Sequence, residues 1–129
     1  MKPLNCIWFE DKADYAAKLE SQTIMPLCDQ LGIGFMGVRF EDESGLPEFS
    51  KGIHLDLVLV DHNLIGTITG DQIITKIREH KHNKDVEIIY YSTNTQVVDL
   101  QKLAGKYDNI IIIHRNDLPS YLVRFLKNF

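Results

Sequence analysis

The sequence predicts an α/β fold: a (βα)5, doubly wound, parallel five-stranded sheet with helices on both faces. Two observations carry this prediction. Five short apolar runs recur along the chain, and segments with apolar residues at helical spacing follow most of them. The third run is apolar enough for a strand buried on both faces, as is usual in parallel sheets. The five predicted strands cover residues 5–9, 34–40, 54–60, 86–91 and 110–113.

Between the first two strands, residues 12–31 predict one long helix with an apolar inward face. Pro26 should kink or divide this helix, because proline has no N–H to donate and crowds the preceding turn. Gly32 would end it. After the second strand, residues 41–45 are an acidic loop, and residues 46–51 can make at most a short helix. The inward face of the long helix would comprise Ala16, Leu19, Thr23, Leu27 and Leu31.

A helix follows each of the last three strands. Thr69-Gly70-Asp71-Gln72 has the spacing of a capping box and would open the first helix. Ser92-Thr93-Asn94 would supply a loop and a cap for the second, over about residues 95–107. Asp117 would cap the third, with Pro119 tolerated in its first turn. The predicted buried residues of these helices are Ile73, Ile74, Ile77, Val98, Leu100, Leu103, Ala104, Leu118, Leu122, Phe125 and Leu126.

Size and composition indicate one globular domain over residues 1–129. A hydrophobic fraction of 44% supports a core, and a net charge of −4 with scattered basic residues argues against a nucleic-acid surface. Cys6 and Cys28 are expected to be reduced and buried. No apolar stretch is long enough for export or for a membrane span. We therefore expect a cytoplasmic location.

Polar residues follow the predicted strands at the points where the strands end. Asp61 follows the third strand, Glu10 and Asp11 follow the first, Ser92 follows the fourth and Arg115 the fifth. The carboxyl ends of parallel strands share one edge of the sheet, where ligands bind, so these side chains should gather there. A desolvated carboxylate is costly unless it is paired. Three acids at this edge would make a hard oxygen site suited to Mg²⁺.

In order and spacing, these residues resemble the receiver domain of bacterial two-component response regulators over nearly the whole chain. Glu10-Asp11 match the family's metal-binding acids, residues 57–61 match the strand that ends in its phosphoacceptor aspartate, and Ser92 matches its hydroxyl residue. The resemblance implies a flavodoxin-like sheet with strand order 2-1-3-4-5 and a single receiver-like domain.

The resemblance also implies the chemistry of the site. Asp61 would accept a phosphoryl group from a histidine kinase or a small phosphodonor. Asp11, with Glu10 acting through water, would hold Mg²⁺ together with Asp61 and the backbone carbonyl of Asn63. Ser92 would donate a hydrogen bond to a phosphoryl oxygen. A carboxylate nucleophile suits phosphoryl transfer when the charge on the phosphoryl oxygens is neutralised.

The expected partners follow from this chemistry: a histidine kinase or phosphotransfer protein upstream and an unidentified protein downstream. No nucleic acid or membrane is expected, and association as a homodimer is left open. The domain would signal rather than act as an enzyme, beyond its own phosphorylation and dephosphorylation.

The fifth strand departs from the family pattern. The family has a lysine after this strand, usually followed by proline, and the chain has Ile113-His114-Arg115-Asn116. Arg115 takes the place of the lysine in the most natural register, and a slip of one residue would put His114 there. Arginine keeps the charge but is planar and forked. The switching aromatic residue of the family's fifth strand is an isoleucine in either register.

These departures leave two alternatives open. One is a divergent pseudo-receiver that acts as a phosphorylation-independent interaction module. The other, ranked last, is a Mg²⁺-dependent phosphohydrolase, which usually has a second acid two residues after its nucleophile, where this chain has Asn63.

Each site residue also has a purely structural interpretation. Asp61 could accept backbone N–H bonds at a strand end, and Glu10 and Asp11 could stabilise the start of a helix. Ser92 could be a helix cap, and Arg115 a solvated surface charge.

Two further motifs receive little weight. The G-x-G-x-x-G pattern at residues 32–37 follows a helix and opens a strand, the reverse of the order in dinucleotide-binding sites. His80 and His82 lie at a polar helix end, which favours a solvated surface over a metal pair.

Overall fold

The computed structural model describes the backbone of residues 1–129 and the side chains of all of them except Ser50. Its centre is a five-stranded sheet in which every neighbouring pair is parallel, in the order β2-β1-β3-β4-β5. The predicted fold class and strand order are therefore confirmed. The strands are β1 (Lys2–Phe9), β2 (Ile33–Phe40), β3 (Leu57–Asp61), β4 (Ile88–Ser92) and β5 (Ile110–His114).

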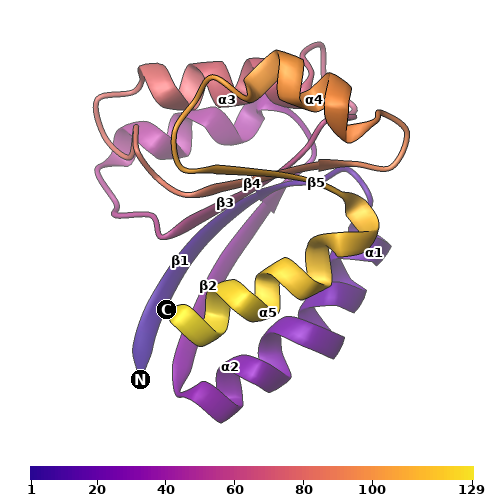
Figure 1. The fold of residues 1–129 in the computed structure, drawn as a ribbon. Helices are drawn as coiled ribbons and strands as arrows, with labels where there is room; N and C mark the ends of the chain where they lie inside the picture. Colours follow the sequence, from indigo (N-terminus) through magenta and orange to yellow (C-terminus); the bar gives the residue numbers. More distant parts are fainter.

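Helices cover the two faces of this sheet (Figure 1). The first face carries α1, α2 and α5, and the second carries α3 and α4. None of the helices in the described chain is long and apolar enough to cross a membrane. The helical segments are α1 (Ala13–Leu19), the π-helical turn η1 (Glu20–Ile24), α2 (Met25–Leu31), the 3₁₀ segment η2 (Glu43–Lys51), α3 (Gly70–Glu79), α4 (Val97–Ala104), the 3₁₀ turn η3 (Arg115–Asp117) and α5 (Leu118–Asn128).

The long helix predicted between the first two strands is divided, as Pro26 indicated. The π-helical turn η1 separates α1 from α2 and ends two residues before Pro26. Because proline cannot donate a backbone hydrogen bond, the turn before it must change its bonding pattern, and π turns are one way to do so. Gly32 ends α2 with a φ of 70°, a left-handed conformation that glycine adopts without strain.

Apolar side chains form a core on each face of the sheet, because alternate residues of a strand point to opposite sides. In β1, Leu4, Cys6 and Trp8 face α1, α2 and α5, whereas Ile7 and Phe9 face α3 and α4. Both cysteines of the chain are free and buried, as predicted.

The cover of the sheet is less complete than the sequence predicted. The segment between β2 and β3 forms only the 3₁₀ segment η2, so no α-helix covers the neighbouring part of β2. Met36 and Val38 in β2 are consequently 60% and 53% exposed. The helical segment itself begins at Glu43, inside the predicted loop 41–45.

Several helix predictions need correction. Val98 and Leu103 were expected to be buried, but they are 55% and 43% exposed. The helix α4 begins at Val97, two residues later than predicted, and presents only the narrow stripe of Leu100 and Ala104 to the core. Asp117 does occupy the cap position of α5, but its side chain makes no cap hydrogen bond because a 3₁₀ turn leads directly into the helix.

Leu31, expected on the inward face of the first helix, is also exposed, at 43%. It is the last residue of α2, next to Gly32, where the chain turns away into β2. By contrast, the predicted capping box at the start of α3 is present. The side-chain oxygen of Gln72 accepts a hydrogen bond from the backbone N–H of Thr69 at 2.9 Å.

Candidate functional site

Three acidic side chains meet at the carboxyl edge of the sheet. Asp61 is the last residue of β3, while Glu10 and Asp11 follow β1, the neighbouring strand. One ligand atom from each of the three lies within 4.8 Å of the others. Glu10 is fully buried and Asp61 is 5% exposed. The structure therefore brings together the three acids that the sequence predicted to cluster.

Arg115 supplies the positive charge at this cluster. Its Nη2 lies 2.6 Å from Glu10 Oε1 and 4.0 Å from Asp61 Oδ2, and the side chain is 11% exposed. The guanidinium lies over the ring of Tyr15, 3.8 Å from its centroid, in a cation–π contact. His114 ends β5, and its Nδ1 accepts the backbone N–H of Asn116 at 3.0 Å. Arg115 is thus the residue that reaches the acids.

Glu10 is held by a chain of hydrogen bonds. The Tyr91 hydroxyl donates to Glu10 Oε1 at 2.9 Å and accepts from Trp8 Nε1 at 2.8 Å. The backbone N–H of Lys12 donates to Glu10 Oε2 at 3.0 Å. With Arg115 on the same carboxylate, both Glu10 oxygens have partners. A buried carboxylate needs this degree of pairing.

The surroundings of Asp61 raise its pKa to about 7. Burial is the largest cause, and the nearby negative charge of Glu10 adds to it. The Asn63 N–H, 3.2 Å from Asp61 Oδ1, and the guanidinium of Arg115 act in the opposite direction. Burial alone would lower the pKa of Arg115, but Glu10 and Asp61 raise it above its ordinary value. The arginine is therefore firmly cationic.

Some buried polar atoms around the acidic cluster have no hydrogen-bond partner among the described residues. They are Asp11 Oδ1, the Tyr15 hydroxyl and Arg115 Nε. Unsatisfied buried polar atoms are uncommon in folded proteins, and each one requires a physical explanation, such as a bound ion or a catalytic role. A free carboxylate oxygen on Asp11, next to Asp61, fits a hard cation such as Mg²⁺. The residues present therefore fit the metal that the sequence implied.

Ser92 is fully buried at the end of β4. Its Oγ accepts hydrogen bonds from Asn63 Nδ2 at 3.1 Å and from the backbone N–H groups of Asn94 and Thr95 at 3.2 and 3.0 Å. The interpretation of Ser92 as a helix cap is wrong, because Gln96 occupies the cap position of α4 and the bonds of Ser92 hold the loop before it. In these bonds the hydroxyl is the acceptor, so its own hydrogen remains available to donate.

Two tyrosines of the site were missed by the sequence analysis. Tyr15 lies four residues after Asp11, about one helical turn, and this spacing could have placed both on one side. Tyr91 lies opposite Asp61 in the β3–β4 register and is fully buried. No signal in the sequence singled out Tyr91, because a tyrosine in a buried strand is also an ordinary core residue.

His62 follows Asp61 in the chain, but its side chain contacts Tyr90 and Asp71 and not the acidic cluster. Its Nδ1 lies 2.5 Å from the Tyr90 hydroxyl and 3.7 Å from Asp71. Burial lowers the pKa of His62.

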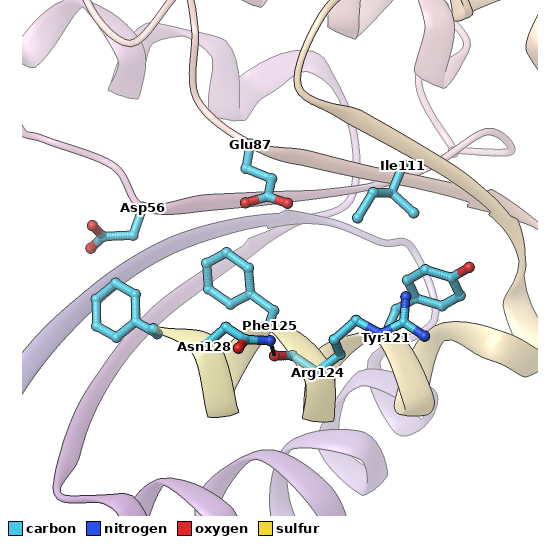
Figure 2. Close-up of a pocket in the computed structure, with 8 residues that line it drawn as sticks. Asp56, Glu87, Ile111, Tyr121, Arg124, Phe125 and Asn128 are labelled. Atoms are coloured by element: carbon cyan, nitrogen blue, oxygen red, sulfur yellow. Dashed lines mark hydrogen bonds between the residues drawn. The ribbon is translucent and has the colours of Figure 1, made fainter.

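A pocket of about 400 Å³ lies away from the acids, between the sheet and α5 (Figure 2). Asp56 and Glu87, which precede β3 and β4, line it at the amino ends of these strands, and Glu87 points toward Phe125 of α5. It shares no lining residue with the acidic cluster. The candidate site is therefore the carboxyl edge and not this pocket.

Comparison with known proteins supports the fold. No protein-family model and no curated protein sequence matches the chain. Among solved structures, it is similar to a response regulator receiver domain from Rhodospirillum rubrum, with a TM-score of 0.70 and 18% identity over 95% of this chain and 91% of that one. It is also similar to a response regulator receiver protein from Sinorhizobium medicae, with a TM-score of 0.71 and 16% identity over 98% and 93%.

A third similar structure is the receiver domain of a sensor histidine kinase from Pseudomonas aeruginosa, described with a magnesium ion coordinated in its active-site cleft. Its TM-score is 0.66 and its identity 18%, over 97% of this chain and 98% of that one. The chain therefore has the receiver-domain fold, as the resemblance implied, together with an acidic cluster at the edge where that fold binds ligands.

Proposed function

We propose that this chain is a signalling receiver in which Asp61 accepts a phosphoryl group, with Mg²⁺, from a histidine kinase or phosphotransfer protein. The observation that carries the proposal is the grouping of Asp61 with Glu10, Asp11 and Arg115 at the carboxyl edge of a receiver fold. If Asp61 were only a structural carboxylate at a strand end, it would not need two further acids beside it. The unpartnered oxygen of Asp11 would then have no explanation.

The proposal gives each acid a role that agrees with its contacts. Asp61 would be the nucleophile, because a carboxylate oxygen can attack phosphorus and form an acyl phosphate. Asp11 and Asp61, with the backbone carbonyl of Asn63 and with Glu10 through water, would hold the metal. Bound Mg²⁺ supplies positive charge that neutralises the phosphoryl oxygens. Asp61 must be ionised to attack, and its raised pKa means that protonation of this carboxyl competes with metal binding near neutral pH.

Arg115 would take the part of the usual lysine. A guanidinium has five N–H donors, so Arg115 can keep one on Glu10 and offer others to a phosphoryl oxygen. The buried and unpartnered Nε of Arg115 is one such donor. Stacking on Tyr15 restricts the long side chain, which reduces the entropy lost when it binds an anion.

Ser92 would link phosphorylation to the surface. A phosphoryl oxygen on Asp61 would attract the Ser92 O–H and draw the residue away from Asn63 Nδ2. Because Ser92 also holds the backbone of Asn94 and Thr95, its movement would shift the segment that leads into α4. The output would be an altered contact with a downstream protein in the cytoplasm, and not turnover of a substrate.

A second candidate is favoured by one observation. The 2.6 Å bond between Arg115 and Glu10, together with the bonds from Tyr91 and Lys12, satisfies the buried acid without a metal. A site closed in this way could keep the fold as an interaction module that needs no phosphorylation.

Intact-mass measurement after incubation with Mg²⁺ and a small acyl phosphate separates the two candidates. If the chain is a phosphorylated receiver, it should gain the mass of one phosphoryl group. This gain should require Mg²⁺, and Asp61→Asn should abolish it. Asp71→Asn is the matched control, because Asp71 lies on α3 outside the acidic cluster and its variant should be labelled normally. The fluorescence of Trp8 reports Mg²⁺ binding in the same samples. A protein that gains no phosphoryl group and also binds no Mg²⁺ would favour the interaction module.

A further inference from the structure

The end strand β2 has an open apolar surface. Met36 and Val38 point to the same side of the sheet and are 60% and 53% exposed, and Ile53 beside them is 51% exposed. They line a hollow of about 410 Å³ with Ile7 and Leu55. The hollow exists because η2, and not an α-helix, connects β2 to β3. In Figure 1, β1 and β2 extend beyond the layer of α3 and α4 toward the N-terminus.

The outer edge of β2 is also available for pairing. The carbonyl oxygens of Gly32 and Phe40 accept hydrogen bonds from the backbone N–H groups of Lys2 and Glu10. The even-numbered residues of β2 therefore direct their backbone N–H and C=O groups toward β1. The odd-numbered residues Phe35, Gly37 and Arg39 therefore direct their N–H and C=O groups outward. Among the described strands β2 pairs only with β1. An eight-residue end strand without a charge before Arg39 lacks the features that normally prevent edge pairing.

We propose that a second copy of this chain docks here, with β2 antiparallel to β2 of its partner about a two-fold axis at Gly37. Such an interface is self-complementary, as two-fold dimers require. Gly37 then faces Gly37, and Phe35 faces Arg39, and each of these pairs can exchange two main-chain hydrogen bonds because all of these residues point outward. The two five-stranded sheets become one continuous sheet.

The side chains select this register. Met36 of one copy faces Val38 of the other in a non-hydrogen-bonded pair, where side chains approach most closely, so each apolar surface covers the other. On the opposite face of the sheet Arg39 faces the ring of Phe35, a favourable pairing of a cation with an aromatic ring. An axis at Arg39 would instead place two arginines against each other, which is unfavourable. The axis at Gly37 also uses nearly the full length of both strands.

Light scattering against protein concentration, with charge variants, tests the surface. The wild type should be a concentration-dependent dimer, and Val38→Lys should raise its dissociation constant at least about tenfold, because a lysine would be desolvated in the pair with Met36. Val98→Lys is the matched control, since Val98 is similarly exposed but lies on α4, and this variant should dimerise normally. A chain that stays monomeric up to about 1 mM, or a dimer broken by Val98→Lys and not by Val38→Lys, overturns the proposal.

Cross-linking tests the register and does not depend on the lysine variant. Facing residues of a non-hydrogen-bonded pair are close enough for a disulfide, so the double variant Met36→Cys/Val38→Cys should form an intermolecular disulfide under mild oxidation. Met36→Cys alone should not, because in this register the introduced cysteine of one copy is displaced from that of the other. Equal cross-linking of the two variants contradicts the axis at Gly37.

Discussion

Replacing the candidate nucleophile should make the metal-free protein more stable, by an amount that grows as the pH rises from about 4 to about 7. Asp61 is buried among Glu10, Asp11 and the Tyr91 hydroxyl, and its pKa of about 7 lies well above the ordinary value of 3.8. The asparagine side chain in the variant Asp61→Asn keeps the shape and still accepts the Asn63 N–H, but it carries no charge. The variant therefore removes the cost of an ionised buried carboxyl.

The size and pH range of this effect follow from the two pKa values. The folded state retains its proton up to about pH 7, whereas the unfolded chain loses it near pH 4, so stability of the wild type falls as the pH rises between these values. The full difference corresponds to about 4 kcal/mol. Screening by solvent and the attraction of Arg115 reduce it, so we expect the variant to gain on the order of 2 kcal/mol at pH 8 and less than half of that at pH 5.

Urea unfolding of both proteins from pH 5 to pH 8.5, in buffer with a chelator, measures this gain. Asp29→Asn is the matched control, because Asp29 is exposed on α2 and its replacement should change stability by less than about 0.5 kcal/mol at any pH. Added Mg²⁺ should stabilise the wild type and not Asp61→Asn. A gain that is the same at pH 5 and pH 8, or a loss of stability at pH 8, would refute the electrostatic reasoning.

Three further predictions concern the neighbours of Asp61. Gly70→Ala should destabilise the fold by about 2 kcal/mol or more in urea unfolding, because its Cβ would lie 2.5 Å from the Asp61 backbone oxygen. Tyr91→Phe leaves the buried N–H of Trp8 without an acceptor, so we expect a loss of about 1–3 kcal/mol; an unchanged unfolding midpoint would count against the hydrogen-bond chain. Arg115→Ala should slow labelling by a small acyl phosphate at least about tenfold, while Arg115→Lys keeps the rate within about tenfold, and equal rates for all three proteins would exclude a role for the charge.

The sequence predicted the sheet and its acidic edge because both depend on simple periodic patterns. Apolar runs locate the strands, and a parallel sheet necessarily brings the residues after β1 and β3 to one edge. The positions of Glu10, Asp11 and Asp61 follow from these two facts alone.

The partners of each side chain were harder to predict, because they depend on packing across the sheet. Whether Arg115 or His114 reaches the acids was decided by the end of β5, which extends through His114. The bond from Tyr91 to Glu10 joins two different strands and has no local sequence signal. Such contacts become visible only when the register of the strands is known.

The exposed residues show a second limit of sequence patterns. Val98 and Leu103 have the spacing of a buried helix face, but α4 is short and buries only a narrow stripe. Met36 and Val38 lie in a strand that the fold class predicts to be covered, yet the connecting segment, which has Pro47 inside it, forms a 3₁₀ segment in place of a covering α-helix. An apolar residue at a regular spacing indicates a surface that can be buried, and tertiary structure decides what buries it.

Locating the phosphoryl group in the chain tests the central claim most directly. The protein is first allowed to react with a small acyl phosphate and Mg²⁺. The phosphorylated side chain of the protein can then be trapped by reduction and located by peptide mass spectrometry. We predict modification at Asp61 alone, lost when the metal is chelated. Modification at another residue, or none under conditions in which the protein is folded and binds Mg²⁺, would contradict the assignment of Asp61 as the phosphoacceptor.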